Sequence, residues 1–158
     1  MTISFDLDDT LIPGTKRFPS EKQTWFQKLL GLEKIRLGTV QLMKKLKAEK
    51  HQVMVYTTSF RSAGHIRWLF LLHGVWLDGI INQRRHDRTL LTEGKRSSKY
   101  PPAFKIEVHV DDSKGVELEG QRYGFRTILI TEQEEDGVAK VLAALEPTNN
   151  AGFVAATP

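Results

Sequence analysis

The residues of this chain that are best suited to chemistry are the carboxylates at the end of its first apolar segment. Residues 2–7 alternate polar and apolar side chains, as a strand does, and the end of this segment carries Asp6, Asp8, Asp9 and Thr10. Like charges crowded into one turn repel one another, and a bound divalent cation would remove that repulsion. Carboxylate oxygens are ligands that suit Mg²⁺. A solvated, Asp-rich turn is the alternative interpretation of these residues taken alone.

Two later segments end in the same manner. The continuous apolar run Val53–Tyr56 is typical of a strand buried on both faces, and Thr57 and Thr58 follow it. Residues 106–110 predict another strand, which leads into Asp111–Asp112. In open parallel sheets, ligands bind beyond the carboxyl ends of the strands, so we expect these polar side chains at one edge.

Apolar periodicity and turn residues predict five strands that alternate with helices. The strands are expected near residues 2–7, 53–56, 79–82, 106–110 and 127–130, and the helices near residues 20–30, 32–50, 62–73, 114–123 and 132–145. Ser20 is expected to cap the first helix, and residues 83–100 are expected to form a loop. This alternation predicts an α/β fold with an open parallel sheet and helices on both faces.

Length and composition describe an ordinary globular chain. Its 158 residues suit one domain, expected at 1–146, with a mobile tail at 147–158. The chain has no cysteine, which excludes disulfides and a cysteine nucleophile and fits a reducing compartment. There is no signal-peptide pattern, and the longest apolar run, Trp68–Leu72, is too short to span a bilayer, so we expect a cytoplasmic protein without a membrane partner. The net charge of +4 favours an anionic ligand.

With its motifs in this order, the chain resembles the haloacid dehalogenase-like (HAD) phosphohydrolase superfamily over residues 3–130. The first family motif, Asp-x-Asp-x-Thr after an apolar strand, is matched by Asp6–Thr10 and is fairly specific. The second, a Thr at a strand end, is matched by Thr57, and the fourth, paired acids after a strand, by Asp111–Asp112. The third is a lysine before the last catalytic strand. The resemblance implies a three-layer α/β/α, Rossmann-like fold.

The resemblance also implies a role for each carboxylate. Asp6 would be the nucleophile that forms an aspartyl-phosphate, and Asp8 would protonate the leaving oxygen and later activate water. Mg²⁺ would be held by the carboxylates of Asp6 and Asp111 and by the main-chain carbonyl of Asp8. Asp112 would be an additional ligand or would lie just outside the ligand set.

The phosphate of the substrate would be bound by a hydroxyl and a lysine. The resemblance assigns Thr57 to this role, and Thr58 could help to position the substrate. Lys99, shortly before the strand that ends in paired acids, is our choice of lysine, with Lys95 and Lys105 as the alternatives.

The spacing of the motifs leaves no room for a large inserted cap domain, so we expect a capless member with an open site. An open site suits a phosphorylated macromolecule, or requires a partner subunit as a lid. Substrate selection would come from a flap at 11–20 and from the basic segment 84–99, which could bind a polyanion or be a solvated loop. We expect His109 to point away from the site.

The sequence therefore predicts a Mg²⁺-dependent phosphatase that acts on a phosphomonoester, either a small molecule or a macromolecule. One alternative is a non-catalytic HAD-like protein that binds or regulates a phosphorylated partner. Another is a phosphatase that processes nucleic-acid ends, and homo-oligomerisation is left open. A pure binding role has no need of Asp6 paired with Asp8, which favours the enzyme.

Overall fold

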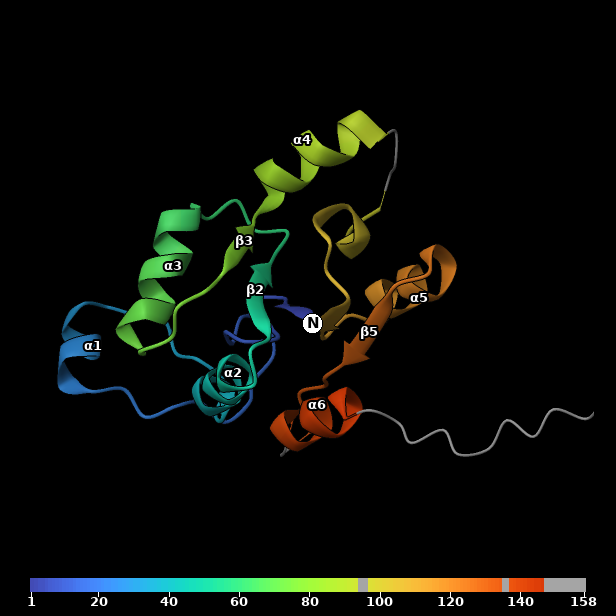
Figure 1. Ribbon diagram of the computed structural model, residues 1–158. Coiled ribbons are helices and arrows are strands. Elements are labelled where there is room, and N and C mark those ends of the chain that lie inside the picture. Colours follow the sequence, from blue (N-terminus) through green and yellow to red (C-terminus); the bar gives the residue numbers. More distant parts are fainter. Residues whose placement is uncertain (94–96, 135–136, 147–158) are drawn as a thin grey trace, which may run out of the picture.

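The computed structural model describes residues 1–93, 97–134 and 137–146. Within these ranges the chain forms a sheet of five parallel strands in the order β3-β2-β1-β4-β5 (Figure 1). The strands are β1 (Thr2–Phe5), β2 (Gln52–Tyr56), β3 (Gly79–Ile81), β4 (Val108–Asp111) and β5 (Arg126–Leu129). The predicted α/β fold with an open parallel sheet is confirmed. Asp111 is the last residue of β4, whereas the sequence placed it just after the strand.

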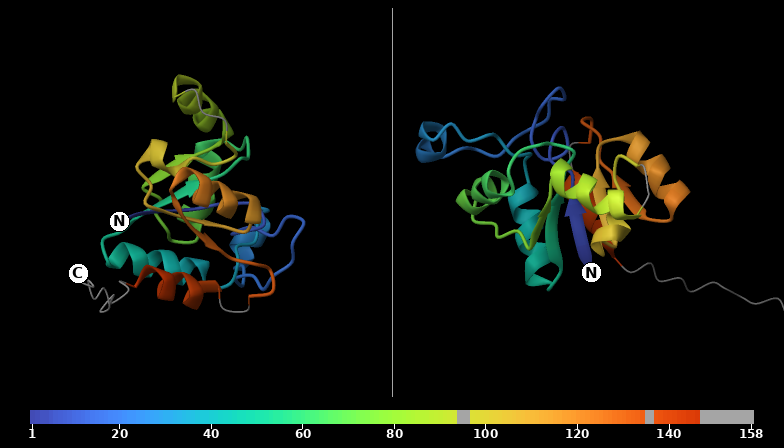
Figure 2. Two further views of the ribbon diagram at one scale, coloured as in Figure 1. Left: turned by 90° about the vertical axis from the view of Figure 1, so that its right-hand side faces the viewer. Right: turned by 90° about the horizontal axis from the view of Figure 1, so that it is seen from above.

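Helices lie on both faces of this sheet (Figures 1 and 2). On one face are α2 (Thr39–Ala48), α3 (Ala63–Leu72) and α6 (Gly137–Leu145), and on the other are α5 (Lys114–Tyr123) and the short 3₁₀ helix η1 (Pro101–Phe104). The five-residue α1 (Trp25–Leu29) lies away from the sheet, on the long connection between β1 and β2, and α4 (Gln83–Glu93) extends from β3.

The alternation of side chains along the strands separates an apolar face from a more polar one. Phe5 and Val55 belong to the main apolar core, together with residues of α2, α3 and α6. On the opposite face the strands present Tyr56, Ser4 and His109, which are all fully buried. Buried polar groups must form hydrogen bonds inside the protein, and on this face several of their hydrogen-bond partners belong to the candidate site.

The first helix begins four residues later than the sequence predicted. Its N-cap is Thr24, whose hydroxyl accepts a hydrogen bond from the amide of Gln27 at 3.3 Å, while the Gln27 side chain accepts one from the Thr24 amide at 2.9 Å. This is a capping box. Ser20 and Gln23 have the same spacing but lie too far ahead of the apolar run, and Ser20 instead forms a bridge with Arg36.

The predicted helix over 32–50 is wrong in its first third, because helix α2 begins only at Thr39. The preceding backbone pairs with the flap instead: the amide of Arg36 donates to the carbonyl of Leu11 at 2.7 Å, and that of Leu37 to Pro19 at 2.8 Å. Gly38 follows with a φ of 83°, in the left-handed region, and serves as the N-cap. Tertiary hydrogen bonds therefore override the helical periodicity here.

The loop predicted at 83–100 is also wrong in its first part, since residues 83–93 form α4. The side chain of Asn82 caps this helix by accepting from the amide of Arg85 at 3.1 Å. Among residues 83–92 of α4, only His86 and Leu90, one turn apart, are buried, so the apolar periodicity of the helix is weak. Residues 94–96 and the expected tail at 147–158 lie outside the described residues, and the mobility of the tail stays a prediction.

Candidate functional site

Strand register brings two of the predicted carboxylates side by side. Strands β1 and β4 are neighbours with Phe5 opposite Val110, and the amide of Asp6 donates to the carbonyl of Val110 at 2.8 Å. Asp6 and Asp111 therefore lie next to each other at the carboxyl ends of β1 and β4. At this place in the sheet the strand order reverses, since β1 is followed by β2 on one side and β4 by β5 on the other. Asp6 is 7% exposed and Asp111 only 2%. Such a switch point is where ligands bind in open α/β sheets.

A buried lysine lies against both carboxylates. The Nζ atom of Lys99 is 2.5 Å from Oδ1 of Asp6, 2.6 Å from the carbonyl oxygen of Tyr56 and 3.6 Å from Oδ2 of Asp111. Lys105, one of the alternative lysines, is exposed and follows η1 with a φ of 56°. The other, Lys95, lies outside the described residues.

A ring of aromatic and hydroxyl groups holds the lysine segment in place. The hydroxyl of Tyr56 accepts from the amide of Tyr100 at 2.9 Å and lies 2.5 Å from Nδ1 of His86. Nε2 of the same imidazole is 3.1 Å from the carbonyl of Ser97. Burial lowers the pKa of His86 below its usual value, so the neutral ring donates from Nε2 and accepts from Tyr56. Both sides of Lys99 are thereby fixed.

The two buried carboxyls differ in their acidity. Burial raises the pKa of Asp6 from 3.8 to about 6, although the charge of Lys99 opposes this and that of Asp111 adds to it. Burial would raise the pKa of Asp111 as well, but the hydrogen bond from His109 and the charge of Lys99 outweigh it and hold this pKa below its usual value. Divergent acidities in one site are typical of functional carboxylates.

His109 faces the site, and the prediction that it points away from it was wrong. Nε2 of its buried ring is 2.9 Å from Oδ2 of Asp111, and Nδ1 is 2.8 Å from the hydroxyl of Ser4. Residues two apart on a strand share a face, which places His109 beneath Asp111. Burial lowers the pKa of His109 to about 4, so the neutral ring donates to Asp111 and accepts from Ser4.

A third carboxylate completes a cluster that could hold a metal. One oxygen atom from each of Asp6, Asp111 and Asp112 lies within 4.8 Å of the others. Oδ1 of Asp112 accepts from the hydroxyl of Thr10 at 2.8 Å, and Oδ2 pairs with Nζ of Lys16 at 2.5 Å. Three convergent carboxylates form a hard, oxygen-only donor set, which fits Mg²⁺.

The side chain of Asp8 lies outside this carboxylate cluster. Oδ1 of Asp8 pairs with Nη1 of Arg61 at 2.5 Å, and Nη2 of the same guanidinium pairs with Glu33 at 2.8 Å. The Asp8 side chain is 42% exposed, so it faces solvent at the mouth of the site. Sequence reasoning missed Arg61, whose only signal is a basic residue four positions after Thr57.

Asp9 has a structural place in the flap. With a φ of 62°, it accepts hydrogen bonds on Oδ1 from the amides of Gly14 at 2.9 Å and Lys16 at 2.8 Å, and on Oδ2 from the hydroxyl of Thr15 at 2.7 Å. These bonds lower its pKa, although burial alone would raise it. They also fix the turn that carries Lys16 to Asp112.

The two predicted hydroxyls differ in their surroundings. Thr57 is buried just beyond β2, where its hydroxyl accepts from the amide of Ser59 at 3.0 Å and its own amide donates to Ile81 at 2.8 Å. Thr58 is exposed. Thr57 therefore shares the carboxyl edge of the sheet with Asp6, and the phosphate-binding role of either hydroxyl stays a prediction.

No protein-family model matches this chain, and no curated protein matches it in sequence. A solved structure described as that of a predicted HAD-like family hydrolase from Porphyromonas gingivalis is similar with a TM-score of 0.50 and 15% sequence identity. The match covers 92% of this chain and 98% of the other. The chain has a HAD-like fold.

In this HAD-like fold, one cavity adjoins the carboxylate cluster. It has a volume of about 440 Å³ and is lined by Asp112, Ser113, Lys16 and Lys114, among others. None of the described helices is long and apolar enough to cross a membrane.

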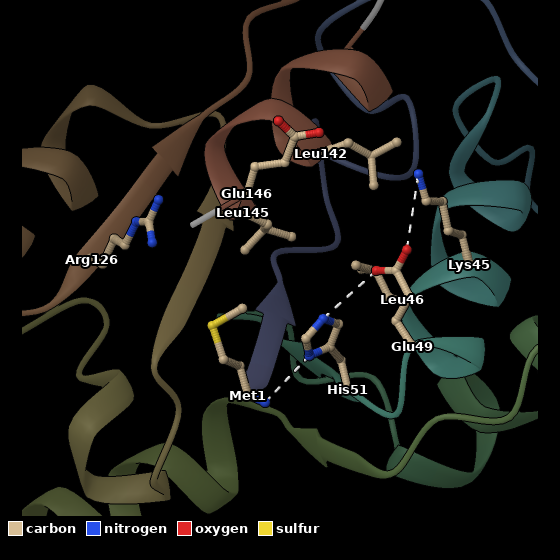
Figure 3. Close-up of a pocket in the computed structure, with 9 residues that line it drawn as sticks. All are labelled: Met1, Lys45, Leu46, Glu49, His51, Arg126, Leu142, Leu145 and Glu146. Carbon is tan, nitrogen blue, oxygen red and sulfur yellow. Dashed lines mark hydrogen bonds and ion pairs between the residues drawn. The ribbon is translucent and has the colours of Figure 1, made fainter. Parts of the chain in front are cut away.

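A second cavity, of about 480 Å³, lies at the amino-terminal edge of the sheet, where Met1 and His51 precede β1 and β2 (Figure 3). Several of its charged groups have partners: Glu49 is 4.0 Å from Lys45 and 3.8 Å from His51, and Arg126 donates to the carbonyl of Ala144. We therefore assign the functional site to the carboxylate edge.

Proposed function

We propose that this protein is a Mg²⁺-dependent phosphohydrolase that acts on a phosphomonoester through an aspartyl-phosphate at Asp6. The observation that carries the proposal is the buried contact of Asp6 with Lys99 beside Asp111 and Asp112. A carboxylate that must attack a phosphate needs a nearby cation to offset the repulsion between two anions.

In the first step, an oxygen of Asp6 would attack phosphorus and the bond from phosphorus to the leaving oxygen would break. Asp8 would donate a proton to that oxygen. In the second step, Asp8 would take a proton from water, which attacks the phosphorus and releases inorganic phosphate and the Asp6 carboxylate. Because the Asp8 side chain is 42% exposed, it has room to turn from Arg61 toward the leaving group.

Mg²⁺ bound by Asp6, Asp111, Asp112 and the carbonyl of Asp8 would supply positive charge between the nucleophile and the phosphate. Lys99 would bind a phosphoryl oxygen and keep Asp6 ionised, and Thr57 would donate a hydrogen bond to another, with Thr58 as a further donor. His109 holds Asp111 in orientation through its Nε2–H.

We further propose that the site is of the capless type. Between β1 and β2 the chain provides the flap, α1 and α2, and between β2 and β3 it provides α3. The flap is braced by Arg36, whose Nε donates to the carbonyl of Thr10 at 2.8 Å. An open site of this kind suits a phosphate carried on a large molecule.

The test is hydrolysis of an aryl phosphate with Mg²⁺, with a chelator, and by Asp6→Asn. We expect activity with Mg²⁺ that is abolished by chelation and falls by about 10⁴-fold or more in Asp6→Asn, since the nucleophile is lost. Asp8→Asn should lose about 10²- to 10⁴-fold, the usual contribution of a general acid. Asp87→Asn, an exposed change on α4, is the matched control and should retain full activity.

Beryllofluoride, which mimics an aspartyl-bound phosphoryl group, provides a second readout that needs no matching substrate. With Mg²⁺ it should raise the melting temperature of the wild-type protein and leave that of Asp6→Asn unchanged. Absence of both the aryl phosphatase activity and this thermal shift would contradict the proposal and favour a non-catalytic phosphate-binding protein.

A further inference from the structure

A cleft along the edge strand β3 gathers four arginines. Its volume is about 400 Å³, and its lining includes Arg67 of α3 and Arg84, Arg85 and Arg88 of α4, with Asn82 at the end of β3. We call these four side chains and the space between them the arginine cleft. Guanidinium groups bind phosphate oxygens through paired, charge-assisted hydrogen bonds. Four of them around one cavity form a site for a ligand with several negative charges.

The arginine cleft has little negative charge of its own. Asp78 is the carboxylate among its described lining residues, and it is held by Nζ of Lys47 at 2.8 Å and by the amide of Val53 at 2.7 Å. Among the described side chains, no carboxylate pairs with any of the four arginines, and Nε of Arg67 is buried without a hydrogen-bond partner. A buried donor without a partner is costly unless a ligand satisfies it.

Helix α4 carries a repulsion that an anion would relieve. Arg84 and Arg88 are exposed and one turn apart, and like charges at this spacing destabilise a helix. The carboxylate of Asp87 on the same helix accepts from the side chain of Gln83 at 2.6 Å and, among the described contacts, forms no ion pair with either arginine. The cavity in Figure 3 provides the contrast, because Lys45 and His51 there lie beside the carboxylate of Glu49.

Residues of the arginine cleft contact an aromatic ring and a neighbour of the candidate active site. The guanidinium carbon of Arg67 lies 5.3 Å from the ring centre of Trp76, which is 54% exposed. Asn82 donates to the carbonyl of Arg61 at 2.9 Å, and Arg61 in turn contacts Asp8. Arg67 therefore connects the arginine cleft to an exposed indole ring, and Asn82 connects it to Arg61 at the mouth of the candidate site.

We propose that the arginine cleft binds the phosphodiester backbone of a single-stranded nucleic acid, with a base stacked on Trp76. A backbone supplies one charge per nucleotide, which suits arginines distributed along a groove, and an aromatic platform beside a cationic groove is how proteins bind single strands with little sequence preference. This binding requires no hydrolysis and goes beyond the proposed function.

The test is fluorescence anisotropy with a labelled oligonucleotide whose ends carry no phosphate, so that the outcome does not depend on phosphatase activity. If each of the four arginines contacts one phosphate, the affinity should fall about 50-fold between 50 and 200 mM salt, from a slope of about 0.7 per contact. Arg84→Gln/Arg88→Gln should bind more weakly, and its affinity should fall only about 7-fold over the same range.

The matched control is Lys44→Gln/Arg122→Gln, which removes the same charge from exposed positions on α2 and α5 and should keep the wild-type salt dependence. Trp76→Leu should weaken binding by about fivefold or more without changing the salt slope, because base stacking is insensitive to salt. Circular dichroism of each variant confirms that it is folded.

Three results would overturn the proposal. One is no binding by the wild type at 50 mM salt, and another is an equal loss in the control variant and in Arg84→Gln/Arg88→Gln. The third is displacement by tripolyphosphate at an equal concentration of phosphate groups, together with unchanged binding by Trp76→Leu. That result would make the arginine cleft a polyphosphate site.

Discussion

Replacement of Asp6 by Asn should change how the stability of the metal-free protein depends on pH. The pKa of Asp6 is raised from 3.8 to about 6, mainly by burial. A carboxyl with a raised folded-state pKa contributes stability that is fully present below its unfolded pKa and is lost as the pH rises through its folded pKa. Asp6 therefore opposes folding above about pH 6, and Asn, which cannot ionise, removes this effect.

The size of the effect follows from the two pKa values. A change from 3.8 to about 6 corresponds to about 3 kcal/mol of unfolding free energy, lost between about pH 4 and pH 7. His109 acts in the opposite direction: its pKa is lowered to about 4, so its contribution is present above 6.5 and is lost as the pH falls through the folded value. The two slopes offset each other in the wild type, and Asp6→Asn should expose that of His109.

Urea unfolding in the presence of a chelator, from about pH 4 to about pH 7, measures this directly. All other groups are present in both proteins, so the difference in unfolding free energy between Asp6→Asn and the wild type reports the removal of the Asp6 carboxyl, including its interaction with Asp111. This difference should shift by about 3 kcal/mol in favour of Asp6→Asn as the pH rises across the range. The exposed control Asp87→Asn should show no comparable shift. A difference constant to within about 1 kcal/mol would refute the view that burial dominates the acidity of Asp6.

Three further changes test one contact at the site and two local features of the fold. Lys99→Met leaves buried carboxylates without their cation and should destabilise the chelated protein by about 3 kcal/mol or more in urea unfolding; a loss below about 1 kcal/mol would show that this cation is dispensable. Gly120→Ala would place a methyl group 2.8 Å from the carbonyl oxygen of Phe125 and should cost about 1–3 kcal/mol. The comparison change Gly64→Ala, in an open helical position, should instead stabilise by about 0.5–1 kcal/mol, and equal effects at the two glycines would contradict this assignment. Thr24→Ala removes the capping hydroxyl of α1 and should lower the free energy of unfolding by about 1 kcal/mol. An unchanged thermal or urea unfolding transition would disprove this.

Much of the fold could be predicted from the sequence, because its strands and main helices satisfy local rules. The helix expected at 114–123 has the predicted bounds, and Ser62 caps α3 where the sequence placed the start of that helix. Some predictions fail because hydrogen bonds to distant backbone determine the local structure. Residues 32–38 have helical periodicity, but the amides of Arg36 and Leu37 pair with the flap. The segment that forms α4 was expected to be a loop, because it is rich in basic residues and has few buried positions.

The candidate site divides in the same way. Asp6 and Asp111 could be expected together, because both lie at the carboxyl ends of strands and parallel strands share an edge. The partners of these acids could not, because they depend on how side chains from distant segments turn. We expected His109 to point away from the site, although it is two residues from Asp111 and residues two apart on a strand share a face. Arg61 and Lys16 carry no local signal, and only the folded chain brings them to their carboxylates.

These partners explain how the chain tolerates so many acids at one edge. Three of the acids are each matched by a cation from another segment: Asp6 by Lys99, Asp112 by Lys16 and Asp8 by Arg61. A divalent cation among the carboxylates would compete with these pairs and free positive side chains at the mouth of the site. Basic side chains freed in this way could bind the oxygens of an incoming phosphate. The charge arrangement therefore links metal binding to phosphate binding, and each should strengthen the other in a thermal-shift titration.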